Sequence, residues 1–201
     1  MKRPNLLTKP TSGVGTIVFD LETNGLINDA THIHCVALHW CDDNRTEAFN
    51  DEKYAESPKE LPMGGNYSIT TALCYLEVAD VLVGHNIVGF DIPIIKRLYP
   101  WFTPSGVIVD TLLLSRLYHP DLFDIDQGRN WKHMPLQLYG RHSLEAYGYR
   151  LGEYKGNFAK TTDWKNWSQE MQDYCLQDVV VTTKLCEHFR PYLDGSKWNT
   201  R

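Results

Sequence analysis

Apolar and polar residues follow two different periods along the chain, and these periods predict a mixture of strands and helices. Residues 15–22, GTIVFDLE, form an apolar run rich in β-branched and aromatic side chains, which is typical of a buried strand. Asn24-Gly25 is a strong turn signal after this run. Two further strands are expected at residues 32–40 and 46–50, so the first part of the chain is predicted to form an antiparallel meander.

The rest of the chain alternates helical periodicity with short buried runs. Residues 51–66 are charged and contain Pro and Gly, which favours a loop, and a second loop is expected around residues 119–135. Short strands are expected in VLVGHN and at the start of VIVDTLLLSRLY. Helices are expected at residues 68–79, from about Pro93 to about Leu98, after Asp110, at residues 142–152 and at residues 168–189. This order predicts an α/β domain with a mixed β-sheet flanked by helices.

Composition allows one such domain and limits where it acts. The chain has 201 residues, of which 42% are hydrophobic, enough for a single core. It contains no apolar run long enough to span a membrane and no signal peptide. Its five cysteines form no CxxC pair, so reduced thiols and a cytoplasmic location are expected. His32, His34, Cys35 and His39 make a zinc site conceivable, but side chains on an ordinary sheet are the favoured interpretation.

The distribution of charge says more than the net charge of −5, which does not itself indicate nucleic-acid binding. Residues 1–115 carry 8 basic and 14 acidic side chains, and residues 116–165 carry 8 basic and 6 acidic ones. Bound divalent cations would offset the acidic part. The mildly basic middle would suit a phosphate backbone, although a solvated surface is the more common meaning of such a balance.

Four acidic residues in three short motifs are the candidate chemistry. Asp20 and Glu22, in DLETNGL, are expected to project from one face of a strand. Each motif has an ordinary alternative: a solvated strand end, a helix N-terminal aspartate at Asp91, or a core tyrosine beside a surface aspartate at Tyr174 and Asp178. However, the apolar TIVF before Asp20 would bury the first two acids, and unpaired buried charge is costly.

The remaining motifs place further acids where they could meet the first pair. Asp91 follows a strand–turn segment, a common place for active-site groups in α/β sheets. Tyr174 and Asp178, in YCLQD, are four residues apart and share a helix face. Four carboxylates suit two hard cations, Mg²⁺ or Mn²⁺, which could clamp a phosphodiester, activate water and stabilise the leaving 3′ oxygen.

In this order and with this tyrosine, the motifs resemble the 3′→5′ proofreading exonuclease domain of family A DNA polymerases from T-odd podophages, in the tyrosine subclass of the DEDD superfamily. VDTLLLSRLYHPDL and GRHSLEAYGYRLGEYKG resemble the linking segments of that group, and the five-residue step from Asn86 to Asp91 fits it. The histidine subclass would place its histidine at the position of Asp173. The resemblance implies a ribonuclease-H-like fold.

The resemblance also implies a role for each matching residue. Asp20, Glu22 and Asp178 would ligate the first metal ion, Asp20 and Asp91 would hold the second, and Tyr174 would orient the attacking water. Contacts to the terminal nucleotide would come from a second group, Thr23, Leu26, Asn86 and Phe90. Asp110 and His142 also match the phage segments and are interpreted as structural.

The resulting expectation is a DNA exonuclease that releases nucleoside 5′-monophosphates from single-stranded or frayed 3′ ends. Residues 1–15 are expected to be a flexible leader, 16–193 the exonuclease domain and 194–201 a tail. The tail EHFRPYLDGSKWNTR ends without a cut helix, which favours a stand-alone protein, with a separate DNA polymerase as a candidate partner. Two alternatives stay open: an RNA 3′→5′ exonuclease of the same superfamily, and a non-cutting polymerase subunit that binds 3′ ends.

Overall fold

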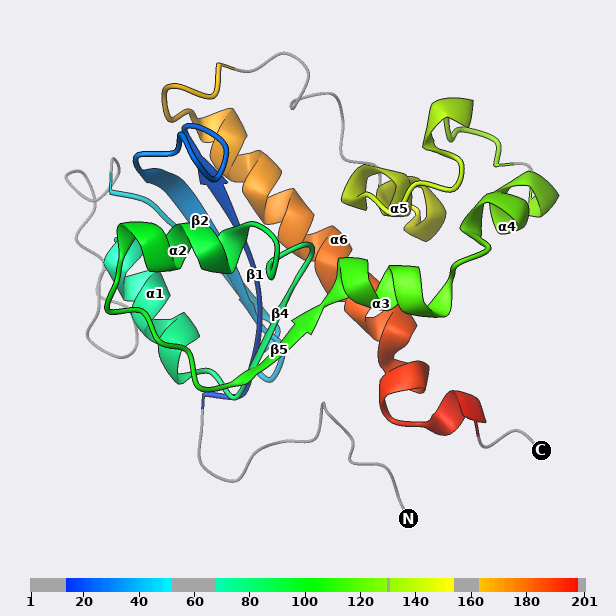
Figure 1. Ribbon diagram of the computed structural model, residues 1–201, viewed down its shortest axis with the longest axis horizontal. Coiled ribbons are helices and arrows are strands. Elements are labelled where there is room, and N and C mark those ends of the chain that lie inside the picture. Colours follow the sequence, from blue (N-terminus) through cyan, green and yellow to red (C-terminus); the bar gives the residue numbers. More distant parts are fainter. Residues whose placement is uncertain (1–13, 52–67, 130, 154–162, 199–201) are drawn as a thin grey trace.

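A mixed five-stranded sheet forms the centre of the molecule (Figure 1). The computed structural model describes residues 14–51, 68–129, 131–153 and 163–198. The strand order is β3-β2-β1-β4-β5, with β1 and β2 and then β2 and β3 antiparallel, whereas β4 runs parallel to both β1 and β5. The strands are β1 (Thr16–Thr23), β2 (Ile33–Trp40), β3 (Arg45–Phe49), β4 (Val81–Gly84) and β5 (Val107–Asp110).

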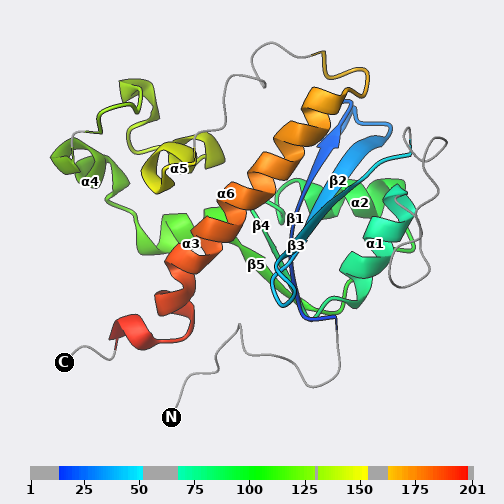
Figure 2. The ribbon, with the colours of Figure 1, turned by 180° about the vertical axis from the view of Figure 1, so that it is seen from behind.

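Helices cover both faces of this sheet, so the predicted architecture is confirmed. Helices α1 and α2 lie on one face and the long helix α6 crosses the other, as the two opposite views show (Figures 1 and 2). The helices are α1 (Ile69–Val78), α2 (Asp91–Leu98), α3 (Thr111–Tyr118), α4 (Leu122–Arg129), α5 (Leu144–Leu151) and α6 (Gln169–Leu193), with short 3₁₀ turns η2 (Leu136–Leu138) and η4 (Ser196–Trp198).

Strand β1 divides its side chains between two cores because successive residues of a strand point to opposite faces. Ile17, Phe19 and Leu21 pack into the core under α1 and α2. Val18 packs into a second core, together with α6. Asp20 and Glu22 have the same parity as Val18, so they emerge on the α6 side of the sheet.

Helices α3, α4 and α5 form a separate layer against the C-terminal half of α6. Leu122, Leu144 and Tyr147 pack there against α6 residues such as Phe189. Three of these helices begin at a side-chain cap. Asp110 accepts hydrogen bonds from the N–H groups of Leu112 and Leu113 at α3, and Ser143 and Ser168 each accept one at α5 and α6.

The prediction of a loop at residues 119–135 is wrong, because α4 lies within this segment. Asp126 does not form a turn: it is fully buried and accepts hydrogen bonds from Arg150. Leu122 anchors the same helix in the core. The Asp and Gly content that indicated a loop is only a correlation, and long-range burial of this acid overrides it. Helix α6 also continues four residues beyond the expected end at Phe189, because Leu193 is still buried against the core.

Two expectations fall mainly on residues that the structure does not describe. The leader at residues 1–15 is described only at residues 14 and 15, and the loop at residues 51–66 only at residue 51. Within the described residues, no helix combines the length and apolar character needed to cross a membrane.

Candidate active site

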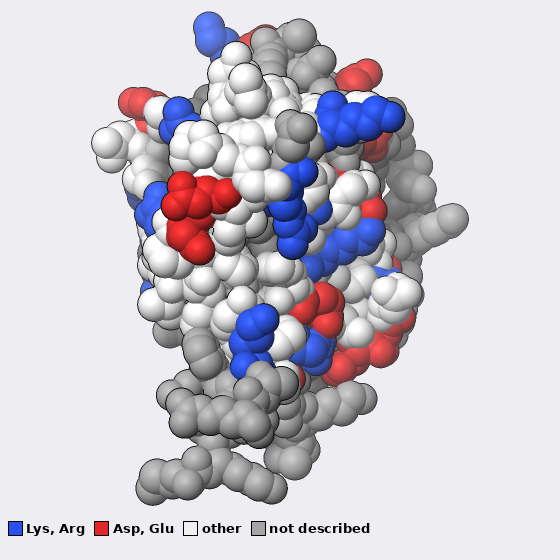
Figure 3. All heavy atoms as spheres, turned by 90° about the vertical axis from the view of Figure 1, so that its right-hand side faces the viewer, with Lys and Arg blue, Asp and Glu red and all other residues white. Residues whose placement is uncertain are grey.

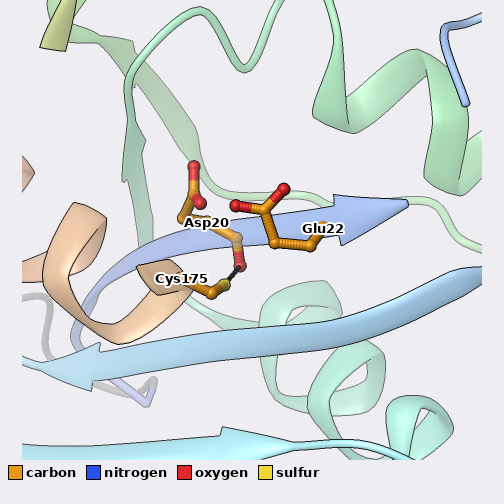
Figure 4. Close-up of side chains that lie close together, drawn as sticks. All are labelled: Asp20, Glu22 and Cys175. Carbon is orange, nitrogen blue, oxygen red and sulfur yellow. Dashed lines mark hydrogen bonds between the residues drawn. The ribbon is translucent and has the colours of Figure 1, made fainter. Parts of the chain in front are cut away.

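The carboxylates of Asp20 and Glu22 lie side by side on the α6 face of β1 (Figure 4). Because β1 lies between β2 and β4, this pair is carried by a central strand of the sheet. Cys175 approaches from α6, and its Sγ donates a hydrogen bond to the backbone oxygen of Asp20 at 3.4 Å. One ligand atom from each of these three residues lies within 4.8 Å of the others. The predicted pair of acids is therefore assembled, with a thiol beside it.

Asp91 is a third candidate acid of the site, and it is buried. It is the first residue of α2, its side chain is 3% exposed, and its Oδ1 atom is buried with no hydrogen-bond partner. Burial raises the pKa of this carboxyl well above its usual value, and the charge of Asp20 raises it further, whereas backbone hydrogen bonds oppose these effects. A divalent cation beside Asp20 and Asp91 would offset both causes, so the residues present fit an oxygen-ligated metal.

Tyr174 and Asp178 lie one turn apart on α6, the helix that packs against β1. Asp178 is buried. Burial raises the pKa of Tyr174, and the charges of Glu22 and then Asp20 raise it further. The phenol therefore stays protonated at neutral pH and can donate a hydrogen bond toward the acidic cluster.

A pocket of about 320 Å³ opens next to this cluster. Three of the predicted nucleotide contacts line it, and they do so together with Trp164. Leu26 is 72% exposed and so free to contact a ligand, whereas the Thr23 hydroxyl donates a hydrogen bond to the carbonyl oxygen of Gly25 at 2.7 Å. The pocket is lined by Glu22, Thr23, Gly25, Leu26, Phe90 and Trp164.

Sequence reasoning missed Trp164. Its backbone oxygen lies 3.0 Å from Nε2 of His34, which ties the segment before α6 to β2. The available signal was a tryptophan in a polar stretch just before the last helix, where no periodicity predicts its position. Its place in the pocket gives the site a second large ring, besides Phe90.

Asn86 lines a different pocket, of about 480 Å³. It has a left-handed backbone conformation with φ of 67°, and its N–H donates a hydrogen bond to Asp110. Arg116 and Arg141 line the same pocket, together with His142. The face that carries α4 and α5 shows Lys and Arg side chains gathered across its middle (Figure 3).

Two residues interpreted as structural make structural contacts. Asp110 caps α3 and also accepts hydrogen bonds from the N–H groups of Asn86 and Val88, which fixes the loop before α2. His142 Nδ1 lies 2.6 Å from the hydroxyl of Ser115, which links α5's entrance to α3.

The conceivable zinc site at the β2 histidines gains no support. His32 Nε2 lies 3.2 Å from His34 Nδ1, and His39 pairs with Thr46. In the part of the chain that the structure describes, the grouping of three or more ligand side chains within reach of one ion is that of Asp20, Glu22 and Cys175, which includes none of these histidines.

With this geometry in view, comparison with known proteins establishes the family. A model of the RNase_H superfamily matches residues 17–190, so the chain belongs to the RNase H superfamily. The DNA-directed DNA polymerase of Escherichia phage T7 is 31% identical over 208 residues, and that of Enterobacteria phage T3 is 30% identical over 212. Both matches cover 89% of this chain and 28% of the polymerase, so the chain spans 28% of the length of these curated relatives.

Solved structures show the same fold. The apo form of a nuclease superimposes with a TM-score of 0.53 at 18% identity, covering 92% of this chain and 86% of the other. NrnC of Brucella melitensis bound to pGG gives 0.52 at 17% identity, covering 92% and 85%. The Nibbler EXO domain of Aedes aegypti gives 0.51 at 14% identity, covering 90% and 84%. The expected ribonuclease-H-like fold and the resemblance to phage polymerases are thus confirmed.

Proposed function

We propose that the protein is a metal-dependent 3′→5′ exonuclease that removes nucleoside 5′-monophosphates from DNA. The observation that carries the proposal is the convergence of acids from two elements, β1 and α2. Asp20 and Glu22 on β1 face α6, and the buried Asp91 on α2 is close enough to Asp20 for the two charges to interact. Membership of the RNase H superfamily and the match to two phage DNA polymerases support this chemistry.

The acids have distinct tasks in this proposal. Asp20, Glu22 and Asp178 would hold one divalent ion, and Asp20 and Asp91 a second. When bound, two such ions supply an activated water and neutralise charge on the phosphate and the leaving 3′ oxygen. Tyr174 would donate its phenolic hydrogen bond to the attacking water, and its raised pKa supports that role because the proton stays on the phenol.

The two pockets give the 3′ end a place to bind. In the pocket of about 320 Å³, the exposed Leu26 and the ring of Phe90 would contact the terminal base and sugar. Thr23 would help to line the pocket around the terminal nucleotide. Its hydroxyl would not donate to the nucleotide, because it already donates a hydrogen bond within the turn. Asn86 would contact the nucleic acid from the pocket of about 480 Å³, where Arg116 and Arg141 suit a phosphate backbone.

Single-stranded or frayed ends would be preferred. Entry of a 3′ end requires separation of the terminal base pair, which costs a few kcal/mol and less at a mismatch. Residues 16–193 would form the catalytic unit, with residues 1–15 and 194–201 outside it. By analogy with the phage relatives, the protein would act in the host cytoplasm, with a DNA polymerase as a candidate partner.

RNA is the second candidate substrate. One structural neighbour, NrnC, was solved with bound pGG. The acidic cluster acts on phosphate and not on the sugar, so discrimination must come from contacts to the 2′-hydroxyl. The non-cutting alternative is disfavoured because all four acids and Tyr174 are present, and the charges of Glu22 and Asp20 influence the pKa of Tyr174.

A digestion assay tests the proposal. The purified chain is incubated with 5′-labelled single-stranded DNA and with RNA of matched sequence, in Mg²⁺, in Mn²⁺ and in chelator. We expect a metal-dependent ladder that shortens DNA from its 3′ end, faster than RNA. Faster digestion of RNA would transfer the proposal to the RNA enzyme. Absence of cleavage with either strand would favour the non-cutting subunit.

A further inference from the structure

The thiol of Cys175 is a feature of the site that the proposed hydrolysis does not use. Cys175 is completely buried, follows Tyr174 on α6 and packs with Val18 and Val179 in the core between β1 and α6. Its sulfur reaches the backbone of β1 beside Asp20 (Figure 4). A buried cysteine is usually a small apolar residue, but this one stands next to two carboxylates.

The spacing of these groups is compatible with a shared ion. The Cys175 Sγ atom and one oxygen each of Asp20 and Glu22 lie within 4.8 Å of one another. Zinc binds thiolate sulfur at about 2.3 Å and carboxylate oxygen at about 2.0–2.2 Å, which places the ligand atoms of a tetrahedral site about 3.5 Å apart. Binding an ion would therefore require these atoms to approach one another from their present separation of up to 4.8 Å.

A second observation points independently to a cation at this place. Asp91 is 3% exposed, and its buried Oδ1 atom has no hydrogen-bond partner among the described residues. Two acids that repel one another in a buried site are stabilised by a positive ion between them. A cation held near Asp91 would therefore give a partner to an oxygen atom that the protein leaves without one.

We propose that Cys175 makes this site bind thiophilic divalent ions, Zn²⁺ or Cd²⁺, through the carboxylates of Asp20 and Glu22 and the sulfur of Cys175. As the metal–sulfur bond forms, the S–H bond breaks and its proton passes to solvent, with no change in oxidation state. Soft ligands such as thiolate favour zinc and cadmium over Mg²⁺. Because the same carboxylates serve the proposed nuclease, these ions would inhibit Mg²⁺-dependent hydrolysis. That consequence rests on the proposed function, whereas the binding itself does not.

Cadmium titration of the metal-free full chain tests the binding without any nucleic acid. Formation of a cadmium–thiolate bond is followed by its ultraviolet charge-transfer absorption, and Zn²⁺ affinity is measured by calorimetry. We expect a charge-transfer band that Cys175→Ala abolishes, with zinc affinity at least about tenfold weaker in that variant. Cys41→Ala is the matched control, because Cys41 is exposed and its thiol neighbours that of Cys186, which makes this pair one competing soft site. Cys35→Ala tests the other, because the thiol of Cys35 neighbours that of Cys175.

Further variants separate a shared site from a lone thiol. Asp20→Asn should weaken zinc binding by a similar factor, and Cys175→Ser, which keeps the side-chain size, should repeat the loss if the alanine variant unfolds. A band that survives in both Cys175 variants, or a zinc affinity unchanged by Asp20→Asn, would overturn the proposal. Absence of nuclease activity would leave these binding results valid, so the two proposals fail separately.

Discussion

Two buried aspartates differ in the charges that surround them. Asp91 belongs to the candidate active site, and Asp126 lies in the α4–α5 layer. Asp126 is fully buried and accepts hydrogen bonds from Arg150 at 2.6 and 3.0 Å, from the Gly140 N–H at 2.8 Å and from Trp131 Nε1 at 2.9 Å. Asp91 is equally enclosed, but the charges near it are those of Asp20 and Asp110, which have the same sign.

The pKa values of the two carboxyls move in opposite directions as a result. Burial and the charge of Asp20 raise the pKa of Asp91. Burial alone would raise the pKa of Asp126 too, but the hydrogen bonds from Arg150, Gly140 and Trp131 outweigh it and lower the value. When protein groups compensate the charge of a buried acid, as at Asp126, the acid has a structural role. When they do not, as at Asp91, the acid is suited to bind a cation.

The largest expected effect is the loss of turnover in Asp20→Asn. This change removes a ligand from the proposed metal site without creating a cavity, so the digestion rate should fall by a factor of about 10³ or more. The thermal midpoint of the metal-free protein should not fall, because the substitution removes a like charge near Asp91. Near-normal digestion by this variant would contradict the metal assignment.

Removal of Arg150 should affect stability instead. Arg150→Met leaves Asp126 buried without its ion-pair partner, which should reduce the free energy of unfolding by about 3 kcal/mol or more. Arg190→Met is the matched control, because its partner Glu187 is exposed and such pairs contribute about 0–1 kcal/mol. Urea unfolding measures the loss of unfolding free energy in each variant. Equal losses in the two variants would contradict the expected difference between the buried and the exposed ion pair.

Metal binding should stabilise the protein only when Asp91 is intact. At a concentration about one hundred times its dissociation constant for the wild type, Mn²⁺ should raise the free energy of unfolding by about 2.7 kcal/mol. Asp91→Asn should show a smaller gain at the same concentration, because one carboxylate ligand is missing. Calorimetric scans with and without Mn²⁺ give both values, and an identical gain would exclude Asp91 as a ligand.

A smaller effect is expected for Tyr174→Phe. Loss of one hydrogen bond to the attacking water costs about 1–1.5 kcal/mol, so turnover should fall about tenfold while binding of the DNA end stays nearly constant. Single-turnover digestion separates the two quantities. If binding weakens and turnover does not change, Tyr174 positions substrate and not water.

The smallest effect concerns acid pH. The folded-state pKa of Asp126 lies below the ordinary value of 3.8, so its contribution to stability is present above 3.8 and is lost as pH falls through the folded value. The stability difference between the wild type and Arg150→Met should therefore shrink as pH falls below 3.8. A difference that stays constant with pH would show that Arg150 acts mainly through packing.

The sequence predicted the elements whose pattern is local and missed those fixed by distant partners. The apolar run before Asp20 and the helical spacing around Tyr174 gave β1 and α6 their correct type. Helix α4 was missed because Asp126 is buried by Arg150, 24 residues away, and no local period records that contact. Trp164 was missed for the same reason, because only the folded chain brings it to Glu22 and Phe90.

The sequence predicted those residues of the candidate site that belong to recognisable motifs. The resemblance supplied the four acids and Tyr174, and strand alternation placed Asp20 and Glu22 on one face. Alternation could not show that Cys175 would approach that face from α6, 155 residues along the chain from Asp20.

Crystals of the protein soaked in Mn²⁺ would test the central assignment most directly, through the anomalous scattering of the metal. We expect manganese bound by Asp20 and Glu22 on β1, within coordination distance of Asp91 or Asp178, and no manganese at Asp126. Manganese located elsewhere, with these carboxylates empty in crystals that still degrade DNA, would contradict the assignment of this acidic cluster as the catalytic centre.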